Sequence, residues 1–141
     1  MFNDDILKEF QGIKENNVNP KELSPLLLAY LGDSVFEIMV RTYVIYDGAR
    51  HLKDLNIVSD KLVNARAQSD LYERIKDMLT DEEAAVFRRG RNAKSSSVAK
   101  HAALGDYKRA TGLESLFGYL YLSGNLKRAM ELFKSGLDIK E

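Results

Sequence analysis

The chain has 141 residues, enough for one domain with a hydrophobic core, and its 45% hydrophobic content argues against a disordered chain. It contains no cysteine, which excludes disulfides and thiolate zinc sites, and no apolar run reaches the roughly 20 residues that span a bilayer. Net charge is zero, but residues 1–37 are acidic overall and residues 88–109 carry seven basic side chains against one acid, which favours a polyanionic ligand.

Helices are expected along most of the chain, since both prolines lie before residue 26. Apolar spacing predicts a short amphipathic helix over residues 4–16, followed by a loop. Ser24-Pro25 is a favourable helix start and Asp47-Gly48 a helix end, so a long helix is expected over residues 25–46. Its apolar character on most sides predicts that this helix is central and buried.

The helical pattern continues through residues 51–79, where Ser69-Asp70 predicts a bend. Residues 80–83 fit a capping box, the arrangement in which a hydroxyl and a carboxylate satisfy the first backbone N–H groups of a helix. A short helix is therefore expected to start there and to end at Gly90. An exposed loop is expected to follow over residues 91–97.

Three helical sections are expected in the last third of the chain: residues 98–104, ending at Gly105; residues 106–122, strongly apolar; and an amphipathic helix starting at Leu126. No segment alternates apolar and polar residues with the period of two that is typical of a strand. We therefore expect an all-α helical bundle, with residues 1–141 forming a single domain. Because the first twenty residues lack the basic start and apolar block of a signal peptide, a soluble cytoplasmic protein without a membrane partner is expected.

Asp33 is the most unusual feature of the long helix, because burying an unpaired carboxylate costs several kcal/mol. A metal ion, an arginine partner or a solvated groove would each explain it. Glu37 and Arg41 follow Asp33 on the same helical face. An ion pair between these two residues, four positions apart, is an adequate structural explanation for Glu37.

Glu114 is a second carboxylate inside a strongly apolar helix. If this helix packs against the long helix, Asp33 and Glu114 converge on one divalent cation, and carboxylate oxygens favour magnesium or manganese over zinc. Residues 111–114 also fit a capping box, in which Glu114 would only start its own helix. The pattern leaves both explanations open. The two histidines lack ligand spacing, and no glycine-rich phosphate loop occurs.

The segments that carry these acids resemble a known family. Residues 30–35, Tyr-Leu-Gly-Asp-Ser-Val, with Glu37 behind them, resemble the signature helix of the ribonuclease III catalytic domain. Residues 111–122 resemble that domain's second acidic helix. Together with Arg-Gly-Arg-Asn-Ala-Lys at residues 89–94, the chain resembles Mini-ribonuclease III, the short bacterial form without a double-stranded-RNA-binding domain, over nearly its whole length.

The resemblance implies a ribonuclease III-like catalytic domain that works as a homodimer. It would use Mg²⁺, with Mn²⁺ as a substitute, to cleave double-stranded RNA, and its implied role is maturation of the large-subunit (23S) ribosomal RNA precursor. Asp33 and Glu114 fall on the family's catalytic and metal-binding acids, and Glu37 is a weaker candidate ligand. The residues expected to contact RNA are Arg89, Arg91, Asn92, Lys94, Lys100 and Arg109.

Three positions that are acidic in the larger family are not acidic here: Leu26, Ala29 and Thr111. Their loss keeps open a second hypothesis, a catalytically silent helical RNA-binding module that acts in ribosome assembly. A third hypothesis is a helical protein-interaction domain whose basic stretch is only a solvated face.

Overall fold

In the part of the chain that the structure describes, helices are joined by short connections, and no strand occurs there. It is a computed structural model that describes residues 2–13, 18–48, 50–94 and 104–137. The all-α prediction is confirmed, and none of the helices in these ranges is long and apolar enough to cross a membrane. In chain order the elements are α1 (Phe2–Ile13), the 3-10 turn η1 (Pro20–Glu22), α2 (Pro25–Tyr46), α3 (Leu52–Val63), α4 (Ala65–Ile75), the 3-10 turn η2 (Lys76–Met78), α5 (Asp81–Asn92), α6 (Leu104–Leu122) and α7 (Leu126–Gly136).

The long helix α2 has the bounds predicted from the sequence. It begins after Ser24, whose hydroxyl oxygen accepts a hydrogen bond from the Leu27 N–H at 3.2 Å, and Pro25 occupies the first helical position. It ends at Asp47, and the following Gly48 has a φ of +112°, a backbone conformation that favours glycine. Local chemistry at both ends therefore sets the length of the helix.

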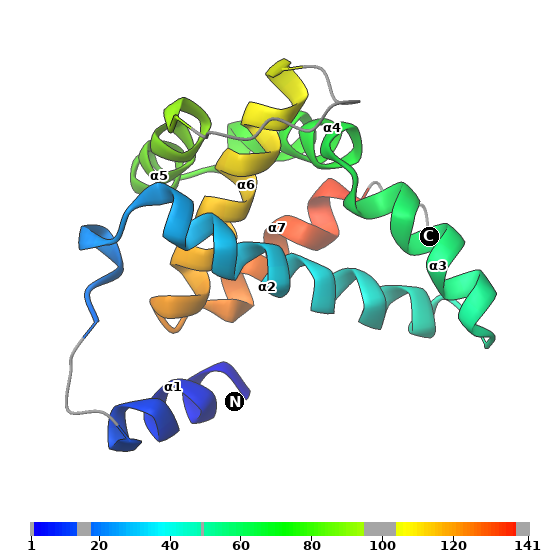
Figure 1. Cartoon of the computed structure of the whole chain (residues 1–141), viewed down its shortest axis with the longest axis horizontal. Coiled ribbons are helices and arrows are strands. Elements are labelled where there is room, and N and C mark those ends of the chain that lie inside the picture. Colours follow the sequence, from blue (N-terminus) through cyan, green and yellow to red (C-terminus); the bar gives the residue numbers. More distant parts are fainter. Residues whose placement is uncertain (1, 14–17, 49, 95–103, 138–141) are drawn as a thin grey trace.

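The hydrophobic core lies where α6 crosses α2 (Figure 1). α6 passes through the middle of the bundle, α2 lies across it, and α4, α5 and α7 pack around it. In the core the ring of Phe36 lies 5.7 Å, centroid to centroid, from the rings of both Phe117 and Phe133. Each of these rings is almost fully buried and contributes roughly 1.5–3 kcal/mol by leaving water. The crossing of α2 and α6 is thus the most firmly held part of the fold.

The break between α3 and α4 lies at Asn64, so the bend predicted at Ser69-Asp70 is wrong. Asn64 separates the two helices and caps α4, because its side-chain oxygen accepts a hydrogen bond from the Ala67 N–H at 2.8 Å. Ser69 is buried within α4, where its hydroxyl oxygen accepts a hydrogen bond from Arg109 Nε at 2.6 Å. A tertiary hydrogen bond occupies the serine hydroxyl, which would otherwise compete for the local backbone.

Two glycines that were expected to end helices lie inside them. Gly90 lies within α5, which continues to Asn92, so the loop expected from residue 91 begins later. A Cβ at position 90 would lie 2.4 Å from Ser115 Oγ, so this glycine is required by close helix packing and not by a turn. Gly105 lies in the first turn of α6, and the expected helical residues 98–103 lie outside the described residues.

The capping box predicted at residues 80–83 is present and starts α5. Thr80 Oγ1 accepts a hydrogen bond from the Glu83 N–H at 3.1 Å, and Glu83 Oε1 accepts one from the Thr80 N–H at 2.9 Å. Glu83 Oε2 also accepts a hydrogen bond from Arg128 Nε of α7 at 2.9 Å. Burial raises the pKa of Glu83, but the Arg128 guanidinium and the Thr80 groups outweigh burial and hold this pKa below its ordinary value. The box therefore also ties the start of α5 to α7.

Candidate active site

Two glycines allow α2 and α6 to touch backbone to backbone. A Cβ on Gly32 would lie 1.7 Å from the carbonyl oxygen of Glu114, and a Cβ on Gly118 would lie 2.0 Å from the carbonyl oxygen of Leu28. Neither position has room for any side chain. Because Asp33 follows Gly32 directly, the helix contact places the Asp33 residue beside Glu114.

The carboxyl groups of Asp33 and Glu114 form a hydrogen-bonded pair at this crossing. Asp33 is exposed, whereas Glu114 is half-buried. Burial is the largest cause that raises the pKa of Glu114 to about 8, and the hydrogen bond to Asp33 and the negative charge of Asp33 raise it further. At neutral pH Glu114 therefore keeps its proton.

The local explanation for Glu114 is wrong. Thr111, expected as a possible helix cap, lies inside α6, where its hydroxyl donates a hydrogen bond to the Tyr107 carbonyl oxygen at 3.0 Å. Glu114 lies deep within the same helix, which begins at Leu104. No capping function remains for this carboxylate, so its cost of burial needs another explanation.

The donor set of the acid pair fits a hard divalent cation. Both groups supply carboxylate oxygens, the ligands that Mg²⁺ and Mn²⁺ prefer. Within the described ranges, no group of three or more histidine, cysteine, aspartate or glutamate side chains is placed to hold one ion. Magnesium is usually held by only one or two carboxylates, with water and substrate phosphates as its remaining ligands. Asp33 and Glu114 therefore match the needs of magnesium when a phosphate substrate is present.

Glu37 makes the ion pair expected for it. Its Oε2 lies 2.7 Å from Arg41 Nε, one helical turn farther along α2. Both side chains are partly exposed, and exposed pairs of this kind contribute only about 0.3–0.5 kcal/mol. The ion pair is an adequate explanation for Glu37, and a role for Glu37 as a metal ligand stays a prediction.

Four of the residues predicted to contact RNA lie at the end of α5 and just after it: Arg89, Arg91, Asn92 and Lys94. Arg91 is half-buried and its Nε donates a hydrogen bond to Asn92 Oδ1 at 3.2 Å, whereas the other three are exposed. Basic side chains at the C-terminal end of a helix also stabilise the helix dipole. These residues therefore stabilise α5 while their charged ends remain available to a polyanion.

The basic end of α5 packs on the part of α6 that carries Glu114. A Cβ at Gly90 would lie 2.4 Å from Ser115 Oγ and 3.0 Å from Gly112 Cα, so α5 meets α6 on both sides of Glu114 in sequence. Arg89 and Arg91 flank this contact point on α5. The helix end that carries the predicted RNA-contact residues thus meets α6 within a few residues of Glu114 in sequence.

The Arg109 side chain forms hydrogen bonds within the protein. Its Nε donates a hydrogen bond to Ser69 Oγ at 2.6 Å, and its Nη2 lies 3.0 Å from Asp106 Oδ1. The Ser69 hydroxyl and then the Arg109 guanidinium hold the pKa of Asp106 below its ordinary value. Arg109 therefore joins α6 to α4, and its contact with RNA stays a prediction. Lys100, the remaining predicted contact, lies outside the described residues.

Ser115 is part of this region, although it is not among the predicted site residues. Its side chain is fully buried, and its hydroxyl lies 2.9 Å from the carbonyl oxygens of both Pro25 and Thr111, so its single proton is shared between these two acceptors. It is the single serine of α6 and lies in an apolar run, which is the signal in the sequence that points to it. A buried polar side chain in such surroundings needs a partner, and here the partner is on another helix.

Known proteins with similar sequences match most of this chain. The family model for the Ribonuclease III domain matches residues 26–125, which include both acids and all of α2 through α6 except Pro25. Mini-ribonuclease 3 of Clostridium tetani is 40% identical over 135 residues, which cover 95% of this chain and 89% of that protein. Mini-ribonuclease 3 of Enterococcus faecalis is 42% identical over 114 residues, which cover 79% of this chain and 86% of that protein.

A solved structure agrees with these sequence matches. The crystal structure of a protein from Fusobacterium nucleatum superposes with a TM-score of 0.72 at 30% sequence identity. The superposition covers 80% of this chain and 90% of that chain. The domain match, the relatives and the helical fold agree with one another, and the chain belongs to the ribonuclease III family.

Proposed function

We propose that this protein is a magnesium-dependent endoribonuclease that cleaves double-stranded RNA. The observation that carries the proposal is the Asp33–Glu114 pair, two hydrogen-bonded carboxyl groups on different helices. Membership of the ribonuclease III family supports RNA as the substrate. The precursor of 23S ribosomal RNA is the proposed natural substrate and the cytoplasm the proposed location, both from the resemblance of the motifs.

Asp33 and Glu114 would hold the magnesium ion, or manganese in its place, with Glu37 as a weaker further candidate. When bound, the ion supplies positive charge that offsets the negative charge developing at the phosphorus during hydrolysis. Glu114 must first release its proton, because only the deprotonated carboxylate is a good ligand. Its pKa of about 8 therefore predicts that the cation binds more tightly as pH rises through neutrality.

The basic segment would supply most of the affinity for RNA. Duplex RNA offers phosphates and 2′-hydroxyls more than readable base edges, so recognition depends on placed positive charge. Arg89, Arg91 and Lys94, with the Asn92 amide, would meet this need at the end of α5. Lys100 and Arg109 extend the proposed contact set. Binding that rests on such charges weakens as salt rises, because cations are released from the RNA.

Cleavage of duplex RNA in the presence of magnesium tests this function. Wild-type protein should cut a duplex and leave a single strand of the same sequence intact. Asp33→Asn should cut at least about 100-fold more slowly, because it removes a charged ligand worth several kcal/mol of transition-state stabilisation. Asp33→Asn should still bind the duplex, with an affinity that falls steeply as salt rises.

A matched control and two contrary outcomes make this test decisive. Asp47→Asn makes the same change at an exposed acid at the end of α2, and it should cut at the wild-type rate. Cleavage by Asp33→Asn at the wild-type rate would reject the assignment of Asp33. Wild-type protein that retards duplex RNA on a gel, but never cuts it with magnesium or manganese, would establish the silent RNA-binding module instead.

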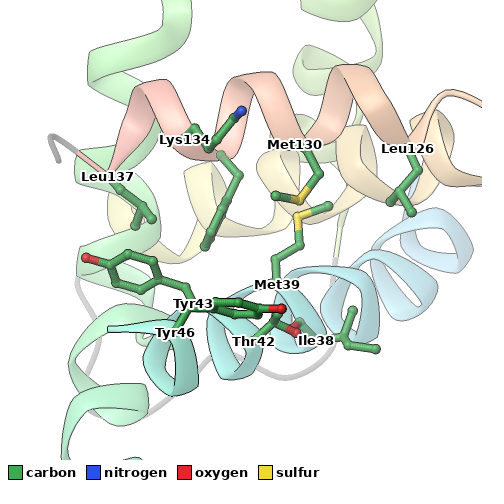
Figure 2. Close-up of a pocket in the computed structure, with 10 residues that line it drawn as sticks. Ile38, Met39, Thr42, Tyr43, Tyr46, Leu126, Met130, Lys134 and Leu137 are labelled. Atoms are coloured by element: carbon green, nitrogen blue, oxygen red, sulfur yellow. The ribbon is translucent and has the colours of Figure 1, made fainter. Parts of the chain in front are cut away.

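A homodimer would place two acid pairs against the two strands of a duplex, whose own symmetry matches a two-fold axis. Apolar surface on α2 supports this proposal: Leu27, Tyr30 and Ile38 are 52%, 80% and 54% exposed. Beside Ile38, an apolar groove of about 440 Å³ lies between α2 and α7, and Figure 2 shows Met39 and Met130 pointing toward each other in it. Exposed apolar surface of this extent marks contact sites.

We expect the protein to sediment as a dimer at micromolar concentration. A charged residue in the apolar surface, Ile38→Lys, should shift the equilibrium toward monomer, because a second copy would have to bury the lysine. Sedimentation equilibrium measures both. A single wild-type species of 16.0 kDa would contradict the homodimer.

A further inference from the structure

Ser115 occupies the point where three helices meet. Its side chain has no exposed surface, and its hydroxyl lies 2.9 Å from the Pro25 carbonyl oxygen, in the first turn of α2. The same hydroxyl lies 2.9 Å from the Thr111 carbonyl oxygen of its own helix. Gly90 of α5 packs directly on it, since a Cβ there would lie 2.4 Å away. Ser115 therefore joins α2, α5 and α6 at the residue next to Glu114.

The hydrogen bond from the Ser115 hydroxyl to the Pro25 carbonyl oxygen can fix the register of α2 on α6. At Gly32 and Gly118 the two helices touch through backbone, which fixes how close they are. A hydrogen bond is directional and fixes one register. Asp33 lies eight residues beyond Pro25 on a straight helix, about 12 Å along its axis, so a slide at Pro25 moves Asp33 by the same amount.

We propose that Ser115 is a positioning residue: its hydroxyl holds α2 in register on α6, so that the carboxylates of Asp33 and Glu114 present their oxygens to one divalent cation. The inference rests on the proposed function, because it assumes that this pair binds the cation. Ser115 itself touches neither cation nor RNA. Hydrogen-bonded residues that orient ligands in this way are typically needed for full metal affinity.

Ser115→Ala removes the hydroxyl and keeps the size of the buried side chain. The RNA-free variant should bind Mn²⁺ roughly tenfold more weakly than wild type, measured from the signal of free Mn²⁺ in electron paramagnetic resonance. The Mg²⁺ concentration for half-maximal cleavage should rise by a similar factor. The dissociation constant for duplex RNA without divalent ions should stay within about twofold, because the phosphate contacts of α5 are unchanged.

Ser123→Ala is the control, because it makes the same chemical change at an exposed residue just after the end of α6. It should leave Mn²⁺ affinity at the wild-type value. If Ser115→Ala fails to fold, Ser115→Cys, which keeps a weak donor, should fold and show a smaller loss of Mn²⁺ affinity in the same direction.

Three outcomes overturn the inference. Wild-type Mn²⁺ affinity in a folded Ser115→Ala or Ser115→Cys protein rejects it while leaving the proposed function intact. Loss of RNA affinity in parallel with metal affinity shows that Ser115 only stabilises the fold. Wild-type protein that neither binds Mn²⁺ nor cuts duplex RNA rejects the proposed function, and the inference with it.

Discussion

Replacing Gly32 with alanine should destabilise the protein and disable the candidate site together. Alanine favours a helix over glycine by up to about 1 kcal/mol, so the change would stabilise an isolated α2. In the folded protein the new Cβ would lie 1.7 Å from the carbonyl oxygen of Glu114, which is backbone and cannot turn aside. α2 and α6 must move apart, and we expect a net loss of roughly 2–4 kcal/mol in the free energy of unfolding.

The activity of Gly32→Ala should fall for the same reason. The atom that the new methyl group meets belongs to Glu114, so the separation of the helices acts directly on the acid pair. Urea denaturation measures the loss of stability, and cleavage of duplex RNA at a temperature where the variant remains folded measures the loss of activity. Gly118→Ala should lose stability and activity in the same way as Gly32→Ala, because its new Cβ would lie 2.0 Å from the Leu28 carbonyl oxygen.

Gly105→Ala is the control, because this glycine-to-alanine change should raise stability and not lower it. Gly105 lies in the exposed first turn of α6, and the nearest atom to a new Cβ there is Nη2 of the long Arg109 side chain at 3.3 Å. With little to displace, the higher helix propensity of alanine should raise stability by up to about 1 kcal/mol. If Gly32→Ala were as stable as Gly105→Ala, the backbone contact of α2 and α6 would be refuted.

Helix ends that depend on local chemistry are predictable from this sequence. Ser24-Pro25 and Asp47-Gly48 mark the ends of α2, and residues 80–83 form the capping box of α5, because in each case the partners lie within a few residues of each other. Gly90 has no such local partner. It resembles a helix end in the sequence, yet its function is to let α5 approach Ser115 on another helix.

The candidate site likewise combines features that are visible locally in the sequence with contacts between distant parts of the chain. Asp33 and Glu114 are each conspicuous in the sequence, because a buried carboxylate in an apolar helix is costly. The burial expected for Asp33 is wrong, since Asp33 is exposed, whereas Glu114 is half-buried. Their proximity depends on Gly32, whose missing side chain matters only against a helix 81 residues farther along the chain, so no local pattern contains it. Arg109 illustrates the reverse: its place in a basic stretch suggests a free phosphate contact, while Ser69 and Asp106 occupy much of its guanidinium.

Replacing Glu114 with glutamine should stabilise the metal-free protein at pH 8 by roughly 3 kcal/mol, although it removes a candidate ligand. In the folded protein Glu114 keeps its proton up to a pKa of about 8, against an ordinary value of 4.5. The folded state thus binds the proton more tightly than the unfolded state. The free energy of unfolding of wild type therefore falls as pH rises from 4.5 to about 8, and glutamine, which has no proton to lose, avoids this loss.

Urea denaturation with a chelator present, at pH 5 and pH 8 and at one protein concentration, measures the effect. The free energies of unfolding of wild type and Glu114→Gln should differ by less than about 1 kcal/mol at pH 5, where wild type has lost little stability. At pH 8 they should differ by roughly 3 kcal/mol. Glu37→Gln makes the same chemical change at the Arg41 ion pair of α2, and it should lower stability by only about 0.3–0.5 kcal/mol at both pH values.

Added magnesium should reduce the difference in the free energy of unfolding between wild type and Glu114→Gln at pH 8. A ligand that binds only the folded protein raises its stability by mass action, and Glu114→Gln should gain little because one of the two charged donors is missing. In the duplex cleavage assay the same variant should be at least about 100-fold slower than wild type. A Glu114→Gln protein less stable than wild type at pH 8 without metal would show that the pKa of Glu114 is not raised in the folded protein. Equal stabilisation of both proteins by magnesium would place the cation elsewhere.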